Sequence, residues 1–221
     1  MDTMRALELR HAVRSYTDQP IAGAELAKLQ QLVADANKKG DVHIQLVLDS
    51  PKAFQGLLPK FAGFKNAKNY FVLAAKKGKE EALGYYGMML MAEAQKLGLN
   101  TCFVAGTYKK EKGAFDLSRG ERVAGVIAVG YGKTQGNPHK SAPLESFADL
   151  TGREPEWFLA GLRAAQKAPT AMNRQNFKFS LKKGDKVALK AGGGSAALDA
   201  GILKYSFEAG AASKGHTVTW A

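Results

Sequence analysis

The chain has 221 residues, 45% of them apolar and 24% charged, so it can form one substantial core or two small fused ones and is neither disordered nor a coiled coil. Its single cysteine excludes an internal disulfide and a metal site built from cysteines. The formal net charge of +12 favours anionic partners, but the lysines occur as scattered pairs at turns, without a zinc-finger spacing or a basic helical arm.

The apolar runs of the chain are short. The longest, residues 88–92 with their neighbours, is far shorter than a bilayer span. Residues 1–14 carry charges throughout and contain no apolar run of the signal-peptide kind. We therefore expect a cytoplasmic protein with neither a membrane nor a nucleic acid as its partner.

A short helix is predicted over residues 3–10, and it leads into an arginine-rich segment. Arg10 and Arg14 lie four residues apart, with His11 between them. Planar guanidinium groups suit phosphate oxygens, so this segment is a candidate phosphate site. The alternative is a surface helix end whose arginines answer the negative end of the helix dipole.

Helical and strand periods then alternate along the chain. Apolar residues fall on one helical face over residues 24–37, and they alternate over residues 43–49 as in a half-buried strand. The remaining strands of the first half are predicted at residues 70–75, 100–105 and 123–129.

The longest helix of the first half is predicted over residues 79–97. It is apolar almost all round, which is typical of a buried central helix. Gly84 and Gly87 lower its helix propensity, so they indicate that another element packs close to its backbone. Gly98 is expected to end it as a left-handed cap.

A boundary is predicted at residues 133–145, which follow neither a helical nor a strand period. Beyond it the order helix, strand, long helix, glycine cap, strand recurs, and one displacement places Gly84 on Gly201. The sequence thus predicts two similar halves, residues 1–132 and 146–221. Their long helices would pack together, and a ligand would lie between the halves.

A polar bend joins a helix to a strand at residues 168–177. Pro169 ends the helix, because its ring disfavours helical geometry at the preceding residue and it has no backbone donor. Thr170, Asn173 and Gln175 offer uncharged hydrogen-bonding groups, which suit a flat heteroaromatic ligand. The alternative is an ordinary polar turn.

Three segments resemble the FMN-dependent nitroreductase family. Residues 10–16 are similar to its phosphate-binding opening, residues 98–106 to its Gly-Leu-Gly-Thr-Cys-Trp segment, and residues 168–177 to its Ala-Pro-Ser-x-x-Asn-x-Gln-Pro-Trp segment. The last lies in the second half here, as in a branch of the family in which one chain carries both halves of the dimer-like unit. The resemblance implies an α+β nitroreductase-like fold, with two α/β halves fused as a monomeric pseudo-dimer; a homodimer is left open.

The resemblance also implies which residues hold FMN. The phosphate ligands would be Arg10, His11, Arg14 and Lys140. The residues around the isoalloxazine and ribityl groups would be Pro169, Thr170, Ala171 and Asn173, with Gln175 close by. The backbone N–H groups of Ala105 and Gly106 would meet the N5 and O4 edge of the flavin. The departures from the family pattern are Ala12 for Ser, Ser141 for Arg and Ser206 for His.

The implied chemistry belongs to the flavin. NADH or NADPH would deliver a hydride to N5, and a nitroaromatic, a quinone or another small planar acceptor would take it up. No catalytic side chain and no metal are expected, since the four histidines share no ligand spacing. The alternatives are a flavin-binding protein with little or different turnover, and a basic nucleic-acid-binding domain without a cofactor.

Overall fold

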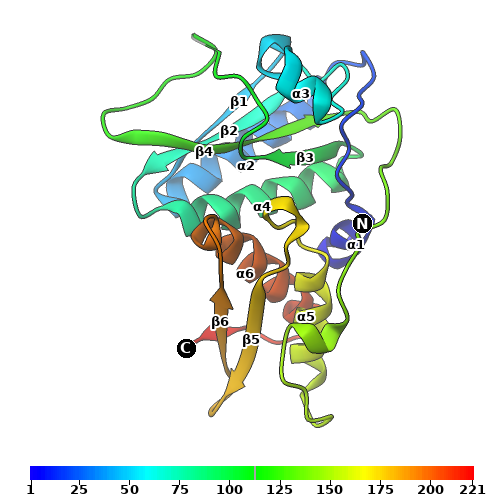
Figure 1. Ribbon diagram of the computed structural model, residues 1–221, viewed down its shortest axis with the longest axis vertical. Coiled ribbons are helices and arrows are strands. Elements are labelled where there is room, and N and C mark those ends of the chain that lie inside the picture. The colour runs from blue at the N-terminus through cyan, green and yellow to red at the C-terminus, as the bar shows by residue number, and fades with distance from the viewer. Residues whose placement is uncertain (112) are drawn as a thin grey trace.

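The structure is a computed structural model that describes residues 1–111 and 113–221. The molecule is elongated, with a four-stranded sheet at one end, a layer of helices in the middle and a three-stranded sheet at the other end (Figure 1). This mixture of helix and sheet confirms the predicted α+β class. No helix in the described part of the chain is both long and apolar enough to cross a membrane.

The larger sheet is antiparallel throughout, with the strand order β1-β2-β4-β3. Phe71 and Leu73 of β2 belong to the main core, whereas Tyr70 and Val72 belong to a second apolar cluster, so β2 is buried on both faces. All the strands predicted for the first half are present: β1 (His43–Val47), β2 (Tyr70–Lys76), β3 (Asn100–Val104) and β4 (Glu121–Gly130).

Helices pack on the main-core face of this sheet. The amphipathic α2 (Gly23–Gly40) and the apolar α4 (Glu80–Lys96) lie where the sequence predicts helices, and α1 (Thr3–Leu9) packs on α4. Two short elements before β2, η1 (Pro51–Phe54) and α3 (Leu57–Phe61), were not predicted, because they are too short to show a period.

The centre of the molecule is the contact between α4 and α6 (Ala196–Ala212). A Cβ on Gly84 would overlap the carbonyl oxygen of Leu198, and a Cβ on Gly201 would overlap that of Glu81. The contact is reciprocal, since the residue one helical turn before each glycine meets the other glycine. The prediction that Gly84 marks close packing is confirmed.

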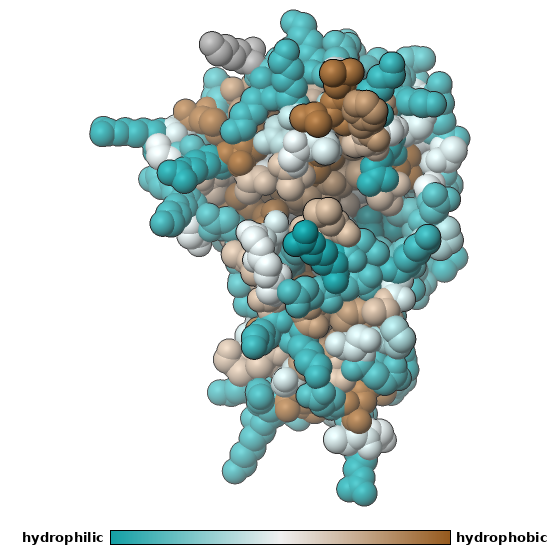
Figure 2. Space-filling model, in the orientation of Figure 1, coloured by the Kyte–Doolittle hydropathy of each residue, from teal (hydrophilic) through white to brown (hydrophobic). Residues whose placement is uncertain are grey.

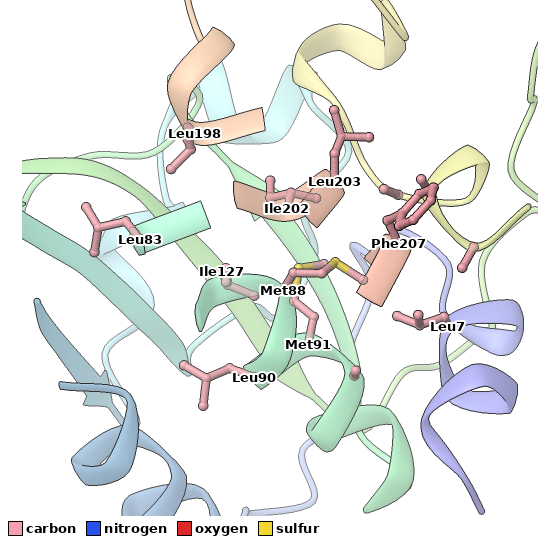
Figure 3. Close-up of a cluster of buried hydrophobic side chains, with 14 of the residues drawn as sticks. Leu7, Leu83, Met88, Leu90, Met91, Ile127, Leu198, Ile202, Leu203 and Phe207 are labelled. Atoms are coloured by element: carbon pink, nitrogen blue, oxygen red, sulfur yellow. The ribbon is translucent and has the colours of Figure 1, made fainter. Parts of the chain in front are cut away.

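Apolar side chains surround this backbone contact. Leu83 and Met88 of α4 lie near Ile202, Leu203 and Phe207 of α6 in one buried cluster (Figure 3). On its other side α6 packs against α5 (Glu156–Gln166), the helix that precedes the polar bend. The helical layer therefore joins the two sheets through a continuous core.

The smaller sheet has the order β5-β6-β7, with β5 (Phe177–Lys182) antiparallel to β6 (Lys186–Ala191) and β7 (Thr219–Trp220) parallel to β6. β5 and β7 agree with the strands expected in the second half. β6 was not predicted, because its apolar residues form a short run between Lys186 and Lys190 and do not alternate cleanly.

The predicted boundary at residues 133–145 has no helix or strand before η2 (Leu144–Ser146), yet it packs on the rest of the chain. Gln135 Oε1 accepts a hydrogen bond from Asn100 Nδ2 at 3.0 Å, and Gln135 O lies 3.0 Å from His11 Nδ1. The segment therefore follows a defined path beside the arginine segment. The division of the chain into two halves at this point stays a prediction.

We expect Gly84→Ala to destabilise the protein, although alanine is the better helix former. The added methyl group meets the backbone of Leu198, so α4 and α6 must move apart, with a loss of about 1–3 kcal/mol in the free energy of unfolding. Urea denaturation measures this loss. Gly194→Ala is the control, because the Cβ position of Gly194 has open space around it. An unchanged or higher stability for Gly84→Ala would contradict the backbone contact.

Candidate functional site

A cavity of about 730 Å³ joins segments that are far apart in the sequence. The arginine segment, the loop after β3, the boundary segment, the polar bend and the start of α6 all contribute to its wall. Figure 2 shows a hollow in the middle of the face that bears the polar bend. Its volume lies in the usual range for small-molecule sites. Every predicted site residue except Gln175 lines this cavity.

The arginine segment reaches the cavity because it runs along the edge strand β3. Ala12 forms a parallel bridge with Thr101, and the Val13 backbone N–H donates to the Thr101 carbonyl at 3.1 Å. Val13 is buried in the second apolar cluster, and its carbonyl accepts a hydrogen bond from the Tyr16 hydroxyl at 2.6 Å. This extended pairing fixes the exposed Arg14 at the cavity wall.

Arg10 is the most unusual residue of the site, because its side chain is 3% exposed and only partly hydrogen-bonded. Nη2 donates to the carbonyl of Lys167 at the end of α5, at 3.2 Å. Nε and Nη1 are buried without a hydrogen-bond partner among residues 1–111 and 113–221. Burial lowers the pKa of Arg10 to about 10, against the opposing effect of Cys102, so the group is charged at neutral pH. A buried guanidinium with free N–H groups is suited to an anion.

His139, on the boundary segment, is connected to the same end of α5. Its Nδ1 lies 2.9 Å from Ser141 Oγ, and that hydroxyl donates to the carbonyl of Gln166 at 3.2 Å. Its Nε2 is buried and finds no partner in the described ranges of the chain. Burial lowers the pKa of His139, and nearby positive charges, that of Arg10 foremost, lower it further. His139 thus lines the cavity, as Arg10 does, and like Arg10 has a buried nitrogen without a partner in the described residues.

The polar bend is clamped to the boundary segment by its own side chains. Asn173 Nδ2 and Gln175 Nε2 each donate to the carbonyl of Lys140 at 2.9 Å, and the Gln175 backbone N–H donates to Thr170 Oγ1 at 3.0 Å. Thr170 and Asn173 still line the cavity, whereas Gln175 shapes the bend behind it. Residues of η3 (Ala171–Asn173) thus form a fixed wall of the cavity.

The chain matches a known protein family over most of its length. A family model described as "Putative TM nitroreductase" matches residues 2–211. The chain belongs to this family. This match confirms the resemblance to the nitroreductase family that three short segments of the sequence show. No curated protein matches the chain.

Solved structures show the same fold at low sequence identity. A "putative nitroreductase" from Thermotoga maritima has a TM-score of 0.72 and 18% identity, and the match covers 97% of this chain and 85% of that one. A nitroreductase family protein from Clostridium difficile 630 has a TM-score of 0.51 and 14% identity, over 70% of this chain and 100% of that one. A "putative NADH dehydrogenase/NAD(P)H nitroreductase" from Bacteroides thetaiotaomicron has a TM-score of 0.50 and 16% identity, over 66% and 95%.

In this member of the family the first turns of α6 form the remaining wall of the cavity. Leu198 and Ile202 are buried and apolar, and Asp199 is the one carboxylate among the described lining residues. Its two oxygens accept from the Ala171 backbone N–H at 3.3 and 3.4 Å. Burial raises the pKa of Asp199, and the Ala171 N–H opposes that rise. The cavity therefore has a cationic region at Arg10 and a wall that is mostly apolar.

The departures from the family pattern have different positions in the structure. Ala12 lines the cavity and brings no hydroxyl. Ser141 holds His139 and is not itself a lining residue. Ser206 is fully buried within α6, where its hydroxyl donates to the Ile202 carbonyl at 2.9 Å.

Sequence reasoning missed His139 and Asp199. His139 gave no signal, because what distinguishes it is a contact through Ser141 to a helix end far along the chain. Asp199 lies on the long helix predicted for the second half, but its contact with Ala171 depends on the path of the bend. Across the described residues no group of His, Cys, Asp and Glu is arranged to hold a metal ion.

We expect Arg10→Met to leave the ligand-free protein at least as stable as the wild type. The substitution removes two buried nitrogen donors, Nε and Nη1, that lack a partner among the described residues, which offsets the loss of the hydrogen bond to Lys167. The free energy of unfolding should rise by about 1 kcal/mol, as measured by urea denaturation of protein stripped of bound ligand. Arg14→Met, at an exposed site, should change it by less than about 0.5 kcal/mol. A loss of more than about 2 kcal/mol at Arg10 would show that this arginine is structural.

Proposed function

We propose that this chain is an FMN-dependent oxidoreductase that passes hydride equivalents from NADH or NADPH, through flavin N5, to a nitroaromatic, a quinone or a similar planar acceptor. The observation that carries the proposal is the single cavity that joins buried Arg10 to the polar bend and to the loop after β3. Membership of the nitroreductase family supports the same reaction class. The bound flavin would supply the hydride chemistry.

The residues present fit the phosphate end of FMN. The Nε and Nη1 groups of Arg10 have no hydrogen-bond partner among the described residues and lie on different edges of the planar guanidinium, so each could donate to an anionic oxygen. Arg14 lines the same cavity, so a second guanidinium would share the anionic charge, and His11 lines it as well. Lys140 is exposed at the rim, where it could meet the phosphate from the solvent side.

The opposite walls fit a flat ring. Leu198 and Ile202 offer apolar contact from α6, and Pro169 faces the cavity from the bend. Ala105 and Gly106 follow the end of β3 and are exposed, so their backbone groups are available to the polar edge of a ring. No side chain of the chain needs to act as a nucleophile; these walls would bind and orient the ring and exclude water from one side.

The chain would work as a monomeric pseudo-dimer. The reciprocal approach of Gly84 to Leu198 and of Gly201 to Glu81 supports this proposal, because a twofold-related pair of helices makes such paired contacts. The start of α6 supplies cavity residues in the way that a partner subunit would in a two-chain enzyme. The cytoplasmic location stays a prediction.

FMN binding tests the proposal directly. We expect purified protein to bind FMN, and Arg10→Met to weaken binding by roughly tenfold or more, because charge-assisted hydrogen bonds to the phosphate are lost. Quenching of flavin fluorescence gives the dissociation constants. Lys183→Met is the matched control, since it removes one positive charge in the exposed turn between β5 and β6, away from the cavity. Equal weakening in both variants would assign the effect to net charge and not to a site at Arg10.

Turnover is tested on the loaded protein. We expect NADH or NADPH to bleach the flavin spectrum under anaerobic conditions, and a quinone or a nitroarene to restore it. Stopped-flow absorbance measures both half-reactions. A protein that binds FMN and is not reduced by either nucleotide would be a flavin-binding protein of another kind.

A further inference from the structure

Two side chains are bonded to the C-terminal end of α5: Arg10 directly, and His139 through Ser141. The carbonyl of Lys167 accepts from Arg10 Nη2, and the carbonyl of Gln166 accepts from the Ser141 hydroxyl, which in turn contacts His139 Nδ1. Such C-terminal carbonyls lack helical partners and carry the negative end of the helix dipole, so they suit donors and cations. Both side chains are thereby anchored on the same helix end, and both line the same cavity.

The hydrogen bonds fix the orientation of the His139 ring. A serine hydroxyl has one hydrogen. When Ser141 gives it to the Gln166 carbonyl, the Ser141 oxygen accepts the proton on His139 Nδ1. Neutral His139 therefore carries a bare lone pair on Nε2. That buried atom has no hydrogen-bond partner within the residues that the structure describes. Protonation would convert it into a charged N–H donor in the wall of the cavity that Arg10 also lines.

The charges around His139 oppose protonation in the ligand-free protein. Burial lowers its pKa below the ordinary value, and Arg10, Lys167 and His11 lower it further, in that order. The one carboxylate among the described lining residues, Asp199, accepts a hydrogen bond from the Ala171 backbone. An anion placed between His139 and Arg10 would reverse this balance.

The geometry points to His139 as a phosphate ligand of the FMN site that binds only in its protonated form, so its contribution to FMN affinity is gained at acid pH and lost at alkaline pH. This inference rests on the proposed function. It goes beyond it by adding, to the permanently charged arginines, a phosphate ligand whose charge depends on pH. It also assigns Ser141 a role as a positioning residue, which fixes the tautomer of His139.

The direction of the pH effect follows from linkage. His139 has a lowered pKa in the free protein, and a bound phosphate dianion raises it, so binding takes up a proton at pH values between the two. The contribution of His139 to FMN affinity is complete at pH values below its pKa in the free protein. It disappears as the pH rises through its pKa in the complex. The phosphate itself loses a proton near pH 6 or so, which strengthens binding to Arg10 as pH rises. A ratio of dissociation constants cancels this second effect, because the ligand is the same.

The test compares FMN dissociation constants of the wild type, His139→Gln and His139→Lys from about pH 5.5 to about pH 8.5. We expect His139→Gln to bind roughly tenfold more weakly than the wild type at the acid end, and about equally at the alkaline end. His139→Lys keeps its charge and should bind more tightly than the wild type at the alkaline end. Ser141→Ala should reduce the acid-side advantage, and His43→Gln, a histidine on β1 outside the cavity, should show no effect at any pH.

A measurement on the wild type alone guards against variants that fold poorly. Calorimetric titration with FMN in two buffers of different ionisation enthalpy gives the number of protons exchanged. We expect proton uptake at pH values between the pKa of His139 in the free protein and its pKa in the complex. Riboflavin, which has no phosphate, should show no uptake. Two results would overturn the inference and leave the proposed function standing. One is a ratio of FMN dissociation constants, His139→Gln to wild type, that does not change with pH. The other is a pH-dependent ratio that appears for His11→Gln or Lys140→Gln and not for His139→Gln. Failure of every protein to bind FMN would overturn both.

Discussion

The close contact between α4 and α6 is the constraint on which the rest of the structure depends. Two glycines let the helix backbones touch, and the same turn of α6 that meets Gly84 supplies Leu198, Asp199 and Ile202 to the cavity. Packing and site are therefore coupled. A backbone contact, not adaptable side chains, sets the distance between α4 and the turn of α6 that lines the cavity. A site built in this way has walls from both ends of the chain.

The fold also buries a charged group at the site whose hydrogen bonds are only partly made, which is unfavourable for stability. Arg10 is buried with two free N–H groups, and its single hydrogen bond goes to the end of α5, so the fold holds a charge that apolar packing around it cannot satisfy. Such an arrangement is unfavourable for folding alone and favourable for an anionic ligand, because the N–H groups are already desolvated and oriented before binding. The apolar clusters on both faces of β2 supply the stability that permits it.

The sequence predicts the parts of this protein that depend on local patterns. The apolar surface of residues 79–97 predicts a buried central helix, and Gly84 within it predicts a closely packed neighbour. Both features can be found in the local sequence, because they depend on burial and on the backbone. Arg10 and the polar bend are found through their chemistry. β6 is missed because a short strand edged by lysines has no clear period, and His139 is missed because only the folded chain brings it, through Ser141, to the end of α5.

The segment that looked like a linker is part of the site. Residues 133–145 lack a period because several of their groups are bonded to other segments. Lys140 O accepts from the polar bend, Gln135 O lies 3.0 Å from His11 Nδ1, and His139 is connected through Ser141 to the end of α5. Irregular chain can follow such a path because it is free of the repeating hydrogen bonds of a helix or strand. An absence of periodicity therefore has two physical meanings, a flexible connection or a surface shaped to a ligand. In this chain the bonds from the bend and from the end of α5 favour the second.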